Sequence, residues 1–159
     1  MRSPDYAFKT VQAYKEAVNL IVKNNYTQQD KDRLKKLLNE VYTRGFSDGF
    51  YKGAVQDWIT RELEHTYEKH MVGQVVRFLK KISVAEIKVL SFGINPGDKL
   101  LFFGNKTTPQ WIDDYEMQIK GEKINSAQKG DLIGMKVPFE VRPKDKIFVW
   151  RKKCKMKLF

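Results

Sequence analysis

The chain has 159 residues, with 30 Lys and Arg against 19 Asp and Glu, so its formal net charge is +11. Hydrophobic residues make up 42% and aromatic residues 13%, which is enough for a packed core and excludes a wholly disordered protein. No apolar run approaches the roughly 20 residues of a membrane helix, and the single cysteine, Cys154, excludes a disulfide scaffold and a cysteine-based zinc site within one chain. Since the N-terminus also lacks the apolar stretch of a signal peptide, we expect a soluble, cytoplasmic protein with no membrane partner.

The first 22 residues predict an amphipathic helix. Ser3-Pro4-Asp5 supplies a hydroxyl cap, a proline in the first turn and an acidic residue beside the positive helix end. Apolar residues at three- and four-residue spacing then form one stripe, and Asn24-Asn25 ends the helix. The stripe comprises Tyr6, Ala7, Val11, Tyr14, Ala17, Val18 and Ile21.

A second helix is predicted to begin at Thr27, with Asp30 completing a weaker form of the capping box. Its expected buried face consists of Leu34, Leu37, Leu38 and Val41. Neither helix can bury its stripe alone, so the two should pack on each other or on another surface.

Residues 42–53 carry Gly45, Gly49 and Gly53 between aromatic residues, and we expect an ordered loop because three glycines would cost a helix roughly 1 kcal/mol each. Residues 55–69 could form a third helix.

From Met71 the pattern changes to short β-rich runs separated by turn residues. The candidate strands are 71–79, 83–91, 98–103, 114–120, 132–137 and 146–151. We find no internal repeat.

The predicted fold class is therefore α+β: a helical segment with a glycine and aromatic loop over 1–70, and a six-stranded antiparallel β-barrel with a basic tail over 71–159.

The positive charge is unevenly distributed along the chain, because residues 71–159 hold 18 Lys and Arg against 9 Asp and Glu. Such an excess favours a nucleic-acid partner, although a solvated lysine surface would look the same. The candidate nucleic-acid contacts are Arg77, Lys80, Lys81, Arg142, Lys144, Lys146, Arg151, Lys152 and Lys153. Phe78, Phe148 and Trp150 could stack on bases or belong to the core.

No catalytic constellation is found in the sequence. His65 and His70 are five residues apart and would not share a helix face, so no metal or cofactor is expected. The acidic group Asp113, Asp114 and Glu116 is explained by charges that protect an edge strand. Cys154 has lysine neighbours that favour the thiolate, but no base is tied to it by sequence.

Two segments resemble the collagenase-like peptidases, family thirty-two of the unknown-mechanism peptidases. The first is Arg2-Ser3-Pro4-Asp5-Tyr6, followed by Tyr14 and Ala17. The second is Arg44-Gly45-Phe46-Ser47-Asp48-Gly49-Phe50. Residues 71–76, 95–100 and 130–137 resemble that family's C-terminal module, which is itself similar to the second, β-barrel domain of elongation factor Tu.

The resemblance implies that the active region lies upstream, so that no catalytic residue of the family can be carried over to this chain. The chain would correspond to the family's C-terminal half, either as a fragment or as a separate small subunit. Residues 54–70 depart from the looser linker expected there. Members are described as proteases, but several resemble hydroxylases that act on transfer RNA, ribosomal RNA or quinone precursors.

Three hypotheses follow. The chain positions RNA, such as tRNA or rRNA, for modification by a catalytic domain or subunit of the same family. Alternatively, it is the C-terminal part of a peptidase, and its barrel presents or docks a protein substrate. In the third, it docks a catalytic partner through the apolar stripes of residues 4–41, which exposed Tyr6, Tyr14 or Leu37 would favour.

Overall fold

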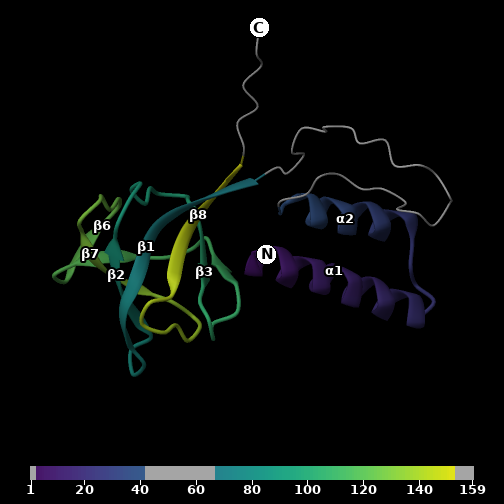
Figure 1. Ribbon diagram of the computed structural model, residues 1–159, viewed down its shortest axis with the longest axis horizontal. Helices are drawn as coiled ribbons and strands as arrows, with labels where there is room; N and C mark the ends of the chain where they lie inside the picture. The colour runs from purple at the N-terminus through teal and green to yellow at the C-terminus, as the bar shows by residue number, and fades with distance from the viewer. Residues whose placement is uncertain (1–2, 42–66, 153–159) are drawn as a thin grey trace, which may run out of the picture. The chain divides into compact units, whose positions relative to one another are not determined.

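A computed structural model describes residues 3–41 and 67–152, which belong to two compact units (Figure 1). The helices lie in a unit formed by Met1–Glu68 with Lys152–Phe159, and the second unit is Lys69–Arg151. Within the described residues, neither helix combines the length and apolar character that a membrane crossing requires.

Helix α1 spans Pro4–Val22, as the sequence predicts. Ser3 occupies the N-cap with extended backbone, but its hydroxyl forms no capping hydrogen bond, so the predicted hydroxyl cap is wrong. Pro4 lies in the first turn and Asp5 beside the positive end of the helix, as expected. Asn24 adopts the left-handed conformation at φ 51°, and the amide of Asn25 donates to the carbonyl of Leu20 at 2.9 Å. This C-terminal motif satisfies a carbonyl that the helix leaves open and ends it at the predicted place.

Helix α2 spans Gln28–Asn39, and the predicted capping box at its start is confirmed. The Thr27 hydroxyl accepts from the amide of Asp30 at 3.2 Å, and the Asp30 carboxylate accepts from the amide of Thr27 at 3.1 Å. The two helices run side by side (Figure 1). Leu34 is 5% exposed and Val41 1%, whereas Leu37 and Leu38 are only half-buried.

The apolar stripe predicted on α1 does not face the interior. The buried residues of α1 are Asp5, Lys9 and Ala13, and Lys9 forms an ion pair with Glu40. Most of the predicted stripe lies on the other side of the helix, where Val11, Tyr14, Val18 and Ile21 are each more than half exposed. The expectation that the helices bury these stripes on each other is therefore wrong for α1.

An antiparallel sheet of eight strands follows the helices in the described part of the chain, which makes the fold α+β as predicted. The strand order is β4-β3-β8-β1-β2-β7-β5-β6, and the long β1 lies between β8 and β2 (Figure 1). The strands are β1 (Tyr67–Leu79), β2 (Val84–Val89), β3 (Lys99–Phe103), β4 (Gln110–Ile112), β5 (Met117–Ile119), β6 (Glu122–Ile124), β7 (Leu132–Lys136) and β8 (Lys146–Lys152).

The expected number of strands, six, is too low. The run 114–120 supplies only β5, and β6 follows it through a tight turn in which Lys120 and Gly121 both have positive φ. Strand β4 has three residues, too few for a period of two to be visible. The third helix expected over 55–69 is wrong at its end, because Tyr67–Lys69 lie in β1, and its residues 55–66 lie outside the described residues. The loop 42–53 also lies there, and the likeness to elongation factor Tu stays a prediction.

One hydrophobic cluster fills the sheet unit. Its side chains that are 0% exposed include Val72, Ile87, Leu100, Phe102, Ile133, Met135 and Ile147. They come from five different strands, so the sheet curves around a common core.

Three turns of the same design introduce β3, β7 and β8. They are Asn95-Pro96-Gly97-Asp98, Gln128-Lys129-Gly130-Asp131 and Arg142-Pro143-Lys144-Asp145. In each turn the aspartate amide donates to the carbonyl three residues earlier at 3.1 Å, and the aspartate carboxylate accepts from the amide of that first residue. The third residue has a positive φ of 81°, 101° and 72° respectively. This is a type II turn, whose third position favours glycine.

Candidate functional site

Six of the predicted cations lie on segments that meet where the β7–β8 loop lies against β1. The amide of Lys144 donates to the carbonyl of Val75 at 2.8 Å, and the amide of Val75 donates to the carbonyl of Asp145 at 2.9 Å. The side-chain amide of Gln74 also donates to the carbonyl of Lys144 at 3.0 Å. Segments about 70 residues apart in the sequence are thereby fixed beside each other. We define the basic cluster as Arg77, Lys80, Lys81, Arg142, Lys144 and Lys146.

Two members of the basic cluster are paired with carboxylates. Arg77 donates to both oxygens of Glu86 at 2.7 and 3.2 Å, and Lys80 lies 2.8 Å from Glu140. The hydrogen bond from Lys80 lowers the pKa of Glu140, and the bond with Glu86 raises the pKa of Arg77. Both cationic side chains are more than half exposed, so these pairs are weak and can be exchanged for phosphate.

The other four cations of the basic cluster form no ion pair within residues 3–41 and 67–152. The third residue has positive φ in all three turns, but it is glycine in two of them, Gly97 and Gly130, and lysine in the third, Lys144. A lysine in the left-handed region costs roughly 1–2 kcal/mol. Strain of this kind is typical of positions that are kept for function.

Arg151 has a structural role that the sequence does not predict. Its guanidinium donates two hydrogen bonds to Asp98, at 2.9 and 2.6 Å, and so joins β8 to the turn before β3. Burial alone would raise the pKa of Asp98, but the hydrogen bonds from Arg151 and from the amide of Asn95 bring it below its usual value. The phosphate contact predicted for Arg151 would have to compete with this carboxylate.

The remaining predicted positions lie partly within the described residues. Lys152 is exposed at the end of β8, and Lys153 lies outside the described residues. Of the family-motif residues, Ser3, Pro4, Tyr6 and Tyr14 lie on or next to α1. The others, Arg2, Arg44, Gly45, Phe46, Gly49 and Phe50, lie outside the described residues.

The aromatic residues near the cations are largely committed to packing. Trp150 is 5% exposed and meets Trp111 edge to face with ring centroids 6.0 Å apart. Phe148 stacks on Phe103 at 4.9 Å, and Phe78 packs against the core. Base stacking on Trp150 is therefore excluded without a rearrangement, and Phe148 has one ring face already covered.

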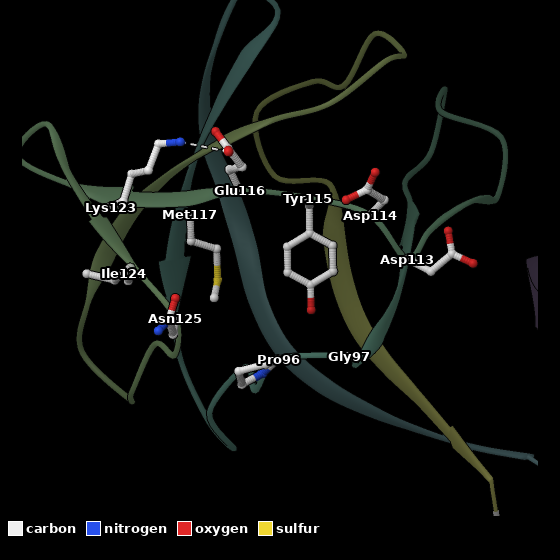
Figure 2. A pocket seen from close by; sticks show the side chains of 10 residues that line it. All are labelled: Pro96, Gly97, Asp113, Asp114, Tyr115, Glu116, Met117, Lys123, Ile124 and Asn125. Atoms are coloured by element: carbon white, nitrogen blue, oxygen red, sulfur yellow. Dashed lines mark hydrogen bonds and ion pairs between the residues drawn. The ribbon is translucent and has the colours of Figure 1, made fainter.

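A cavity of about 320 Å³, which the sequence does not predict, lies beside β5 and β6 (Figure 2). The ring of Tyr115 stands in its middle, with the hydroxyl pointing toward Pro96 and Gly97 (Figure 2). Met117 and Ile124 supply apolar surface, and the carboxylates come from Asp113, Asp114 and Glu116. These acidic residues belong to the β4–β5 connection, so they are not edge-strand charges as expected.

The polar groups of the cavity are held by neighbours. The Tyr115 hydroxyl donates to the carbonyl of Asp98 at 2.8 Å, and burial, followed by the nearby Asp98 carboxylate, raises the pKa of Tyr115 to about 12. Lys123 donates to Glu116 at 2.7 Å, which lowers the pKa of Glu116. Among the residues lining the cavity there is no histidine, cysteine or serine, so it offers a binding surface and no nucleophile with a base.

The sequence contains a signal for the unusual position of Lys144, although not for the cavity. The spacing from Asn95 to Asp98 recurs from Gln128 to Asp131 and from Arg142 to Asp145, in each case directly before a strand. Comparing these three turns would have identified Lys144 as the exception. The cavity has no such signal, because its walls come from turns and short strands.

The chain is similar to known proteins of one kind. Residues 1–60 match the profile of peptidase family U32. A collagenase of Porphyromonas gingivalis is 29% identical over 154 residues, covering 96% of this chain and 43% of that protein. An uncharacterized protease of Methanocaldococcus jannaschii is 32% identical over 154 residues, covering 93% of this chain and 37% of that protein. The chain therefore spans less than half the length of the curated relatives it matches.

Among solved structures, the chain is similar to the C-terminal domain of a protein from Geobacillus thermoleovorans described as a putative U32 peptidase. The sequence identity is 18% and the TM-score 0.46, and the match covers 49% of this chain and 96% of that domain. Together the profile and the two relatives confirm the resemblance to the collagenase-like peptidases, and residues 1–60 are the part of the chain that matches peptidase family U32.

Proposed function

We propose that this chain is the non-catalytic, C-terminal accessory region of a collagenase-like peptidase family protein, and that it positions RNA for modification by a catalytic region outside residues 1–159. The modification is a hydroxylation or another reaction, and the catalytic region would lie upstream or on a separate chain. The observation that supports the proposal is that the cations of the basic cluster lie on segments, β1, the β1–β2 turn and the β7–β8 loop, which backbone hydrogen bonds and the Lys80–Glu140 pair hold beside each other.

The cluster has the properties that RNA phosphates require. Lys81, Arg142 and Lys144 are exposed and form no ion pair in the described residues, so their charges are available to phosphate. The strained backbone at Lys144 places a cation where glycine would be favoured by local energetics. Phosphate contacts would provide most of the affinity, which makes binding strongly dependent on salt.

The test is binding of labelled bulk transfer RNA across a salt series. A variant with Lys81, Arg142 and Lys144 changed to Glu is compared with a control in which the exposed Lys106, Lys120 and Lys129 are changed to Glu. Both variants change the net charge equally. We expect the cluster variant to bind at least 10-fold more weakly, with a salt slope smaller by about 0.7–0.9 for each lost phosphate contact. Equal losses in the two variants would mean that net charge alone attracts RNA, and the proposal would fail.

A second candidate function is the docking of a polypeptide substrate for a peptidase. It is favoured by the relatives described as a collagenase and a protease, and by the cavity around Tyr115, where carboxylates surround apolar surface. Absence of RNA binding at low salt, with binding of a lysine-rich or arginine-rich peptide that Asp114→Asn weakens, would favour this alternative.

A further inference from the structure

The outer face of α1 carries an apolar stripe that no described residue of its own unit buries. Val11, Tyr14, Val18 and Ile21 are 65%, 64%, 56% and 55% exposed. With Ala7 they follow an alternating spacing of four and three residues over four turns, which places them in one row along the helix. Single exposed apolar residues are ordinary, but a continuous row indicates an interaction surface.

A groove between the helices extends this surface. It has a volume of about 190 Å³, and its walls are formed by Ala13, Tyr14, Ala17, Tyr26, Leu34 and Leu38, with Lys31 and Lys35 at its border. Tyr14 belongs both to the row and to the groove. A partner could therefore lay one apolar face along α1 and insert a side chain beside Tyr14. We call the row and the groove together the α1 surface.

Charge distinguishes between the possible occupants. Lys15 lies one helical turn from both Val11 and Val18, and Lys31 and Lys35 border the groove. The two carboxylates of α1 do not balance them, because Asp5 is 3% exposed and Glu16 accepts a hydrogen bond from Arg33 at 2.6 Å. In a dimer of α1 surfaces, cations would face cations or neutral residues. The surface instead suits an apolar partner bordered by Asp or Glu.

The lengths of the relatives indicate which polypeptide would occupy the α1 surface. The match to this chain covers 43% of the Porphyromonas gingivalis collagenase and 37% of the Methanocaldococcus jannaschii protease, which leaves 57% and 63% of their lengths outside it. Helix α1 lies within residues 1–60, which match the family profile. We infer that the α1 surface docks the region of the family's proteins that lies outside the match to this chain, through an apolar face bordered by carboxylates.

This inference rests on the part of the proposed function that places catalysis outside the chain, and it is independent of RNA binding. The test is co-expression of the full chain with the non-matching region of the Porphyromonas gingivalis collagenase, followed by measurement of complex mass and affinity. We expect a one-to-one complex that Val18→Glu weakens at least 10-fold. Lys15→Glu should weaken it less, and only at low salt.

Two controls separate docking through α1 from a general effect of added charge and from RNA binding. Leu132→Glu makes the same kind of change at an apolar residue of β7 that is 53% exposed, and should leave the complex intact. Lys144→Gly removes a cation of the basic cluster, and should affect RNA binding without affecting the complex. Circular dichroism of Val18→Glu checks that the helices still form.

Three results would overturn the inference. They are the absence of any complex, a complex that Val18→Glu leaves unchanged, and self-association of the chain that the same substitution abolishes. The last result would identify a second copy as the occupant. RNA binding by the basic cluster could still be observed with any of these results, so the docking inference can fail while the proposed function stands.

Discussion

The sheet unit and the helical pair bury their apolar residues to very different extents. Seventeen buried residues form the core cluster of the sheet unit. In the described helices and the residues next to them, the buried apolar residues are Ala13, Leu34 and Val41, while Asp5 and Lys9 are buried with them. Since most of the stabilisation of a domain comes from apolar burial, the sheet unit has the interior of an independent domain and the helical pair does not. Apolar spacing therefore predicts an amphipathic surface without predicting that the same chain covers it.

The largest expected effect is in the core of the sheet unit. Phe102 is 0% exposed, and its ring meets that of Phe139 edge to face at 5.5 Å. Phe102→Ala should lower the free energy of unfolding by about 3–5 kcal/mol, because it removes apolar burial and leaves a cavity. The measurement is urea denaturation followed by tryptophan fluorescence. Ile82→Ala, at a residue that is 58% exposed, is the control and should have little effect. If Phe102→Ala lowered the free energy of unfolding only slightly, the sheet unit would not have the well-packed interior that distinguishes it from the helical pair.

A smaller effect, with a defined pH dependence, is expected from the pair between Arg151 and Asp98. The folded state lowers the pKa of Asp98, so its contribution is present above the unfolded value of about 3.9 and is lost as the pH falls through the folded pKa. Asp98→Asn should cost about 1–3 kcal/mol at pH 7 and make thermal stability less sensitive to acid below about pH 4. Glu116→Gln, whose partner Lys123 is exposed, is the comparison and should cost less than Asp98→Asn, because solvent screens the exposed pair. An unchanged acid profile for Asp98→Asn would show that Arg151 does not hold this turn.

Local signals predict much of this fold correctly. The capping box at Thr27 and Asp30, the break at Asn24 and six of the eight strands depend on residues close together in the sequence, where capping, turn chemistry and a period of two apply directly. Strands β4 and β6 have only three residues each, and their pairing with β3 and β5 decides their conformation. Short strands of this kind are fixed by tertiary contacts and have no pattern of their own.

The candidate site is less predictable for a related reason. The sequence identifies the cations but not their partners, so it cannot separate Lys144 from Arg151, whose guanidinium is held by a carboxylate 53 residues away. The direction of the α1 stripe is also a tertiary property. It depends on Lys9 and Glu40 forming a partly buried ion pair on the face where an apolar contact is expected.

Lys144→Gly should have a modest stabilising effect together with a loss of binding. Glycine removes the strain at φ 72°, and after the entropy of the unfolded chain is subtracted we expect a gain of about 0.5–1 kcal/mol. Transfer RNA should bind several-fold more weakly because a phosphate contact is lost. Lys120→Gly is the matched control: Lys120 has φ 51° in the β5–β6 turn, so the substitution should stabilise the protein without comparable loss of RNA binding. Equal binding losses in both variants would remove the functional reason for the strain.

The smallest effect should come from the α1 surface in the chain by itself. Val18→Ser replaces a side chain that is 56% exposed, and should change the free energy of unfolding by less than about 0.5 kcal/mol. The same change at Val149, which is 1% exposed in β8, should cost about 3 kcal/mol or more, because it also buries a hydroxyl. Thermal denaturation of Val18→Ser and Val149→Ser measures how much stability the same substitution costs in the helical pair and in the sheet unit. If Val18→Ser cost as much as Val149→Ser, the stripe would already be covered within the chain, and no surface would remain on α1 for a partner to occupy.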